Sequence, residues 1–292
     1  MSRWPKNVDF NNPAAEGLPA TRNFYLESEP GVSLGVWHIL PQSAGERERT
    51  QEMFEEELGD DKTIILYLHG NSAHRAGPHR VELYHVLRAM DYHVVCCDYR
   101  GYADSTQVAP SETGVVTDAR AVYDWVMARA GDSKVIVWGH SLGTGVASHL
   151  VADLCLEGSS PCGLVLESPF NNIFDEVRNH PMAWVWRKMP WFDWFFTNSL
   201  AKNDLGFVSD QRISVIDCPV LILHAEDDAV VPFKLGKALH DCALHTRSET
   251  CRAVQFKEFS GELGYAHKYI CRAPELPEIV RDFEQRCCRD HD

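Results

Sequence analysis

Residues 135–143 read VIVWGHSLG, a short apolar run that ends in a Gly-x-Ser-x-Gly pattern. The apolar run predicts a buried strand, and the pattern predicts a sharp turn from that strand into a helix. Gly139 and Gly143 flank Ser141, and because neither has a side chain the turn can be very tight. The hydroxyl of Ser141 is then exposed at a sheet edge, where it is placed to act as a nucleophile.

The segments around this turn alternate between strand-like and helix-like patterns. Apolar runs that predict strands cover 32–41, 64–69, 93–99, 163–168, 220–225 and 253–259. Helical spacing covers 79–90, 113–130, 142–155, 235–243 and 274–287. Apolar strands separated by amphipathic helices are typical of an α/β fold, with a mostly parallel central sheet and helices on both faces.

One block interrupts this alternation. Residues 170–218 separate two predicted strands, which is far longer than an ordinary connection. We expect a helical cap insertion over the sheet edge, between a first core part at 31–169 and a second at 219–288, with an extended N-terminal segment at 1–30. The cap sequence WVWRKMPWFDWFF (184–196) contains half of the eight tryptophans of the chain, namely Trp184, Trp186, Trp191 and Trp194.

Composition excludes several classes of function. The net charge of −14 over 292 residues argues against nucleic acid as a partner, because phosphate binding needs a basic face. No apolar run reaches the roughly 18 residues of a membrane span, and the N-terminus lacks the apolar region of a signal peptide. The ten cysteines form no Cys-x-x-Cys pair and show no metal-ligand spacing, so no metal site is expected.

A serine nucleophile needs a histidine base and a carboxylate that orients this histidine. In α/β hydrolases the three arrive in the chain order Ser, Asp or Glu, His, each after a strand. The stretch from His224 to Pro232 resembles the pattern His-Gly-x-x-Asp-x-x-Val-Pro, which puts Asp228 in the place of the acid. Its neighbour Asp227 is interpreted as a turn-forming or solvated residue, and Glu167, at the end of an earlier strand, is the alternative acid.

The candidate base and the candidate oxyanion donors are chosen by their places relative to the predicted strands and helices. His267 is the only histidine between the last predicted strand and the final helix, so it is the candidate base. The candidate oxyanion donors are the backbone N–H groups of Leu142, at a helix N-terminus, and of Asn71, in the loop after strand 64–69. His69 is interpreted as a residue that organises this loop. The Asp98-x-Arg100 turn is interpreted as structural.

The motifs together resemble the alpha/beta-hydrolase domain-containing protein 12 family of lysophosphatidylserine and monoacylglycerol lipases. The resemblance covers nearly the whole chain and rests on YLHGN, CDYRGYADS, WGHSLGTGVA, LESPFNNI, CPVLILHAEDDAVVPF and LGYAHKYI. It implies an α/β-hydrolase fold, with Ser141 as nucleophile, Asp228 as acid and His267 as base, no metal or organic cofactor, and a long-chain acyl ester of glycerol as substrate.

The resemblance also implies a location. Family members carry an N-terminal membrane span and face the lumen of the endoplasmic reticulum, where they are glycosylated. This chain has neither an apolar span nor an Asn-x-Ser/Thr acceptor. The endoplasmic reticulum membrane is therefore the expectation from the family, and the cytoplasm is the alternative.

The sequence has its own indications of a lipid substrate. The tryptophans of the cap are expected to shield an acyl chain and rest on a membrane surface, although rings packed on the sheet as core are the alternative. Candidate cationic contacts for an anionic headgroup are Arg187 and Lys188 in the cap, His74, Arg75, His79 and Arg80 beside the oxyanion loop, and Lys268 beside the base. Two other functions stay open: an acyl-protein thioesterase that uses the same triad, and an inactive hydrolase fold that only binds.

Overall fold

The computed structural model describes residues 8–171, 207–248, 251 and 253–288. These residues contain an eight-stranded sheet with the order β1-β2-β4-β3-β5-β6-β7-β8. The strands are β1 (Thr21–Glu29), β2 (Val32–Ile39), β3 (Ile64–Leu68), β4 (His93–Cys97), β5 (Val135–His140), β6 (Gly163–Glu167), β7 (Val220–Ala225) and β8 (Val254–Phe259). The β1–β2 and β2–β4 pairs are antiparallel, and the other five pairs, among β3 to β8, are parallel, so the predicted mostly parallel sheet is confirmed.

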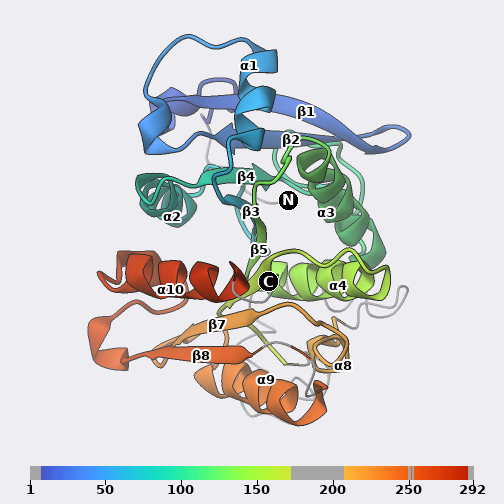
Figure 1. Cartoon of the computed structure of the whole chain (residues 1–292), viewed down its shortest axis with the longest axis vertical. Coiled ribbons are helices and arrows are strands. Elements are labelled where there is room, and N and C mark those ends of the chain that lie inside the picture. The colour runs from blue at the N-terminus through green and yellow to red at the C-terminus, as the bar shows by residue number, and fades with distance from the viewer. Residues whose placement is uncertain (1–7, 172–206, 249–250, 252, 289–292) are drawn as a thin grey trace.

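Helices cover both faces of this sheet, as Figure 1 shows. Helices α2 (Pro78–Ala89) and α10 (Leu276–Cys288) pack on one face, and α3 (Glu112–Met127), α4 (Leu142–Leu156) and α9 (Phe233–Thr246) on the other. Successive strand residues alternate between the two cores: Ile65 packs under α2, whereas Leu66 packs under α3 and α4. Two buried cores explain why these strands are continuously apolar in the sequence.

The N-terminal segment belongs to the sheet. Residues 21–29 form β1, which pairs with β2 along its whole length, and β2 in turn pairs with β4. Residues 1–30, expected as an extended N-terminal segment, therefore include an edge strand that forms a hairpin with β2. A separate short helix, α1 (Gln51–Glu56), occupies the charged connection between β2 and β3.

Most of the predicted cap, residues 172–206, lies outside the described residues, and with it Trp184, Trp186, Trp191, Trp194, Arg187 and Lys188. The point where the chain returns to the core is described. Phe207 is buried against Phe170 and Gly145, and its N–H donates to the carboxylate of Glu112 at 2.9 Å. Glu112 also accepts from Arg212, in the short helix α8 (Ser209–Arg212), so the start of α3 fixes this return. No helix among the described residues is long and apolar enough to cross a bilayer.

Candidate active site

The turn after β5 has the geometry that the glycine pattern predicts. Ser141 lies between β5 and α4 with φ 53° and ψ −121°, a backbone conformation that L-residues rarely adopt. A Cβ atom on Gly139 would lie 2.3 Å from the carbonyl oxygen of Gly143, and one on Gly143 would lie 2.0 Å from that of Leu68. Only glycine fits at either position. The strained turn therefore holds the Ser141 hydroxyl at the carboxyl edge of the sheet.

Three loops at this edge bring Ser141, His267 and Asp228 into one hydrogen-bonded chain. His267 Nε2 lies 3.0 Å from Ser141 Oγ, and His267 Nδ1 lies 2.8 Å from Asp228 Oδ2. The other carboxylate oxygen of Asp228 accepts the N–H groups of Val230 and Val231, both at 2.8 Å. The structure therefore places the three residues predicted from the sequence in the arrangement of a serine nucleophile, a base and an orienting acid.

The Asp228 carboxylate is buried but stays ionised. Burial alone raises the pKa of a carboxyl group, but the contacts from His224 and His267 and the backbone N–H of Val231 outweigh it and hold the pKa of Asp228 well below its ordinary value. His224 Nε2 lies 3.4 Å from Asp228 Oδ2. An ionised Asp228 fixes the proton of His267 on Nδ1 and leaves Nε2 free to accept the proton of Ser141.

The loop of the acid holds the loop of the base through two further carboxylates. Glu226 accepts the N–H of Gly261 at 2.9 Å, and Asp227 accepts the N–H of Ala266 at 3.0 and 3.1 Å. This role of Asp227 was not predicted from the sequence, in which Asp227 was interpreted as a turn-forming or solvated residue. The run of three acidic residues in 226–228 was the available signal, since three carboxylates in one loop need three sets of donors.

Glu167, the alternative acid, is buried next to the site, and its carboxylate bonds to a residue other than His267. Its Oε2 accepts the indole N–H of Trp138 at 2.9 Å, and its backbone carbonyl accepts the N–H of Ser141 at 3.0 Å. Burial raises the pKa of Glu167 to about 7, and the nearby charge of Asp228 adds to this effect. The His267 Nδ1 contact goes to Asp228, so the structure favours Asp228 as the partner of the histidine.

The predicted oxyanion loop runs directly over the nucleophile. A Cβ atom on Gly70 would lie 3.0 Å from the Cβ of Ser141, so the backbone approaches as closely as the absence of a side chain allows. The side chain of the next residue, Asn71, accepts the hydroxyl of Tyr102 at 2.8 Å. The two predicted donors are thus the backbone N–H groups of the residues that follow Gly70 and Ser141. Leu142 is the first residue of helix α4, so its N–H has no hydrogen-bond partner within the helix.

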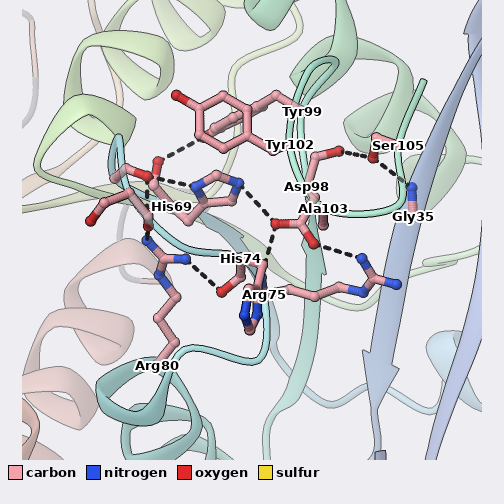
Figure 2. Close-up of polar contacts among 12 residues, drawn as sticks. Gly35, His69, His74, Arg75, Arg80, Asp98, Tyr99, Tyr102, Ala103 and Ser105 are labelled. Atoms are coloured by element: carbon pink, nitrogen blue, oxygen red, sulfur yellow. Dashed lines mark hydrogen bonds and ion pairs between the residues drawn. The ribbon is translucent and has the colours of Figure 1, made fainter. Parts of the chain in front are cut away.

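The prediction that Arg75 binds a headgroup is wrong. Its guanidinium is fully buried and contacts Asp98 and Asp104 at 2.6 Å each, and Asn23 at 2.7 Å, as the close-up in Figure 2 shows for Asp98. The two carboxylates neutralise its charge and use its donors, so Arg75 ties the loop after β3 to the loop after β4. Asp98 is structural, as expected.

The other described candidate cations differ in their exposure to solvent. His74, His79 and Arg80 are buried, which removes them from contact with a solvated headgroup. Lys268 is exposed and directly follows His267. Within the described residues, Lys268 is therefore the exposed member of the predicted cationic set.

Comparison with known proteins identifies the family and the fold of the chain. A family model described as the alpha/beta hydrolase fold matches residues 63–193. Lysophosphatidylserine lipase ABHD12 of Danio rerio is 48% identical over 96% of this chain and 74% of its own length, and that of Gallus gallus is 49% identical with the same coverage. Protein ABHD12B of Homo sapiens is 40% identical over 96% of this chain and 76% of its own.

The chain belongs to the ABHD12 family. Both the resemblance seen in the sequence and the α/β-hydrolase fold are thereby confirmed, and this ABHD12-family chain is an ester hydrolase. Among solved structures, the Pyrococcus furiosus esterase Pf2001 superposes with a TM-score of 0.67 at 19% identity, over 98% of this chain and 97% of that one. The thermostable carboxyl esterase of Bacillus coagulans superposes with a TM-score of 0.59 at 14% identity, over 91% and 96%. At such low identity these structures show the shared fold alone.

Proposed function

We propose that this chain is a serine hydrolase that cleaves the acyl ester of lysophospholipids, lysophosphatidylserine first among them, and also of monoacylglycerols. The observation that carries the proposal is the hydrogen-bonded chain from Ser141 through His267 to Asp228, with contacts of 3.0 and 2.8 Å. The names of the relatives that are 48% and 49% identical support lysophosphatidylserine as the substrate.

Acylation follows from this geometry. Ser141 Oγ attacks the carbonyl carbon of the acyl ester while His267 Nε2 takes the hydroxyl proton. Asp228 stabilises the imidazolium that forms, because its carboxylate is ionised and holds the Nδ1 proton. The carbonyl oxygen becomes an oxyanion, to which the backbone N–H groups of Leu142 and Asn71 donate.

Collapse of the tetrahedral intermediate breaks the bond to the glycerol oxygen. His267 gives its Nε2 proton to this oxygen, the glycerophospho-headgroup leaves as an alcohol, and Ser141 retains the acyl group as an ester. A water molecule then attacks the acyl-enzyme while His267 takes one of its protons. The fatty acid leaves and the Ser141 hydroxyl is restored.

A substrate panel tests the proposal. Purified chain is incubated with lysophosphatidylserine, lysophosphatidylcholine, a monoacylglycerol and a palmitoyl-thioester peptide, and fatty-acid release is measured. We expect hydrolysis of lysophosphatidylserine and the monoacylglycerol, and none of either by Ser141→Ala, which also loses labelling by a fluorophosphonate probe. Fatty-acid release from the thioester peptide alone would show that the chain is an acyl-protein thioesterase. Persistent labelling of Ser141→Ala would show that Ser141 is not the nucleophile.

A second experiment addresses the headgroup. We propose that Lys268 contacts the anionic headgroup, because its ammonium is exposed next to the base. An exposed ion pair contributes up to about 1 kcal/mol, so Lys268→Gln should lower kcat/KM for lysophosphatidylserine about five-fold and leave the uncharged monoacylglycerol unchanged. Lys257→Gln, in the strand before the loop of the base, is the control. Equal losses on both substrates would contradict a headgroup role.

A further inference from the structure

Arg80 is a buried cation whose described hydrogen bonds all go to backbone carbonyls. It lies in the first turn of α2 with a relative exposure of 1%. Its Nη1 donates to the carbonyl of His74 at 2.5 Å, and its Nη2 donates to those of Ser72 at 2.5 Å and Gly70 at 3.3 Å. Figure 2 shows the contact of the guanidinium with the carbonyl oxygen of His74. A single side chain thus ties down the loop that passes over Ser141.

The contact to Gly70 has a direct geometric consequence. The carbonyl of Gly70 and the N–H of Asn71 belong to the same trans peptide, so they point in opposite directions. Arg80 holds the oxygen end of this peptide together with His69, whose Nδ1 lies 2.7 Å from the same oxygen. Fixing the oxygen end fixes the direction of the Asn71 N–H at the other end.

We propose that Arg80 is a positioning residue for the oxyanion hole: it orients and polarises the Gly70–Asn71 peptide so that the Asn71 N–H donates strongly to the oxyanion on the Ser141 adduct. The proposal rests on ester hydrolysis at Ser141 from the proposed function, and it is independent of the headgroup that the substrate carries.

The charge of Arg80 adds to this effect, in contrast to that of Arg75. Arg75 is neutralised by two carboxylates, whereas Arg80 contacts only neutral groups among the described residues, so its positive potential extends into the site. The pKa of His79 falls to about 3, first through burial and then through the charges of Arg80 and Lys268. A field that disfavours a positive imidazole also favours a negative oxyanion.

Three variants test the proposal: Arg80→Met, Arg80→Lys and, as a matched control, Arg88→Met, which removes another buried arginine of α2. Each is assayed on p-nitrophenyl butyrate for kcat and KM, with a short-chain trifluoromethyl ketone, which forms a tetrahedral adduct with the serine, for Ki. Thermal unfolding is recorded in parallel. We expect Arg80→Met to lower kcat about 10- to 100-fold with KM within three-fold, and to raise Ki by a similar factor.

Arg80→Lys should show a smaller fall in kcat and a smaller rise in Ki, because an ammonium keeps the charge but reaches fewer of the carbonyls. Arg88→Met should keep kcat and Ki near those of the wild type. If Arg80→Met and Arg88→Met lose the same activity, or if kcat falls while Ki is unchanged, the proposal is overturned. If Arg80→Met does not fold, Arg80→Lys decides, since a folded Lys variant with wild-type kcat and Ki contradicts it. Failure on lysophosphatidylserine with retained hydrolysis of the p-nitrophenyl ester would overturn only the substrate assignment.

Discussion

The carboxylate of Asp227 accepts the backbone N–H of Ala266, the residue before His267, at 3.0 and 3.1 Å. Ala266 has a φ of +47°, so the chain enters the loop of the base through a strained residue. On the other side, the carbonyl of His267 lies 2.8 Å from His140 Nε2, which burial keeps neutral by lowering its pKa. The backbone of the base is therefore held at both ends, and Asp227 is one of the two anchors.

Loss of this anchor should reduce catalysis more than binding. Asp227→Ala is expected to lower kcat about ten-fold with little change in KM, because small displacements of a general base are costly. Asp227→Asn, which keeps one acceptor oxygen, should show a smaller fall in kcat. Steady-state kinetics on p-nitrophenyl butyrate measures both, with Glu262→Ala as the control in the same loop, and a loss no greater than that of Glu262→Ala would contradict the role of Asp227.

Replacement of Asp228 separates the two candidate acids. Asp228→Asn presents an amide to His267 Nδ1 and favours the wrong tautomer, so kcat should fall about 10³- to 10⁴-fold with the fold retained. Circular dichroism checks the fold and stopped assays measure kcat. Glu167→Gln, which keeps an acceptor for Trp138, is the matched variant and should stay within a few-fold of the wild type. The reverse ranking of the two variants would make Glu167 the acid.

The triad could be predicted from the sequence because its geometry depends on chain order. Parallel strands end at one edge of the sheet, so Ser141, Asp228 and His267, each just after a strand, are brought together by the topology alone. The glycines of the turn were equally visible, since the 2.3 Å approach of a Cβ atom on Gly139 to the carbonyl oxygen of Gly143 is a local property of the strand-turn-helix unit. Local pattern and strand order were sufficient for Ser141 and His267, whereas Asp228 was distinguished from Glu226 and Asp227 by its match to the His-Gly-x-x-Asp-x-x-Val-Pro pattern.

Arg75 shows why the rest could not be predicted. In the sequence it is a cation beside the oxyanion loop, and its partners Asp98 and Asp104 come from another loop more than 20 residues away. Only the tertiary structure shows that they neutralise it. The edge strand β1 was hard to place for a different reason: one of its faces is partly exposed, so residues 21–29 lack the continuous apolar run of the inner strands.

The close contact at the turn predicts a large effect of one methyl group. Gly143→Ala puts a Cβ atom 2.0 Å from the carbonyl oxygen of Leu68, and backbone on both sides prevents relief. We expect at least about 3 kcal/mol of lost stability and loss of fluorophosphonate labelling. Gly158→Ala is the control: with φ +72° and open space it should lose only about 1 kcal/mol. Urea unfolding measures both, and equal losses would contradict the clash.

The buried carboxyl of Glu167 predicts a dependence of stability on pH. Its pKa is about 7 in the folded chain against an ordinary value of 4.5, so between these pH values the folded state holds a proton that the unfolded state has released. The free energy of unfolding therefore falls as pH rises, by about 1.4 kcal/mol per pH unit and by roughly 3 kcal/mol in all. Above pH 7 no further loss arises from this group.

Glu167→Gln removes this titration and keeps an oxygen that accepts the indole N–H of Trp138. The variant should match the wild type near pH 4.5 and become progressively more stable than it up to pH 7, with a constant difference beyond. Urea unfolding at pH 5, 6, 7 and 8 gives the difference directly. Glu262→Gln, at an exposed position, should show no such trend. A difference between Glu167→Gln and the wild type that does not grow with pH would mean that Glu167 is ionised in the folded chain, because an ionised carboxylate releases its proton in both states alike.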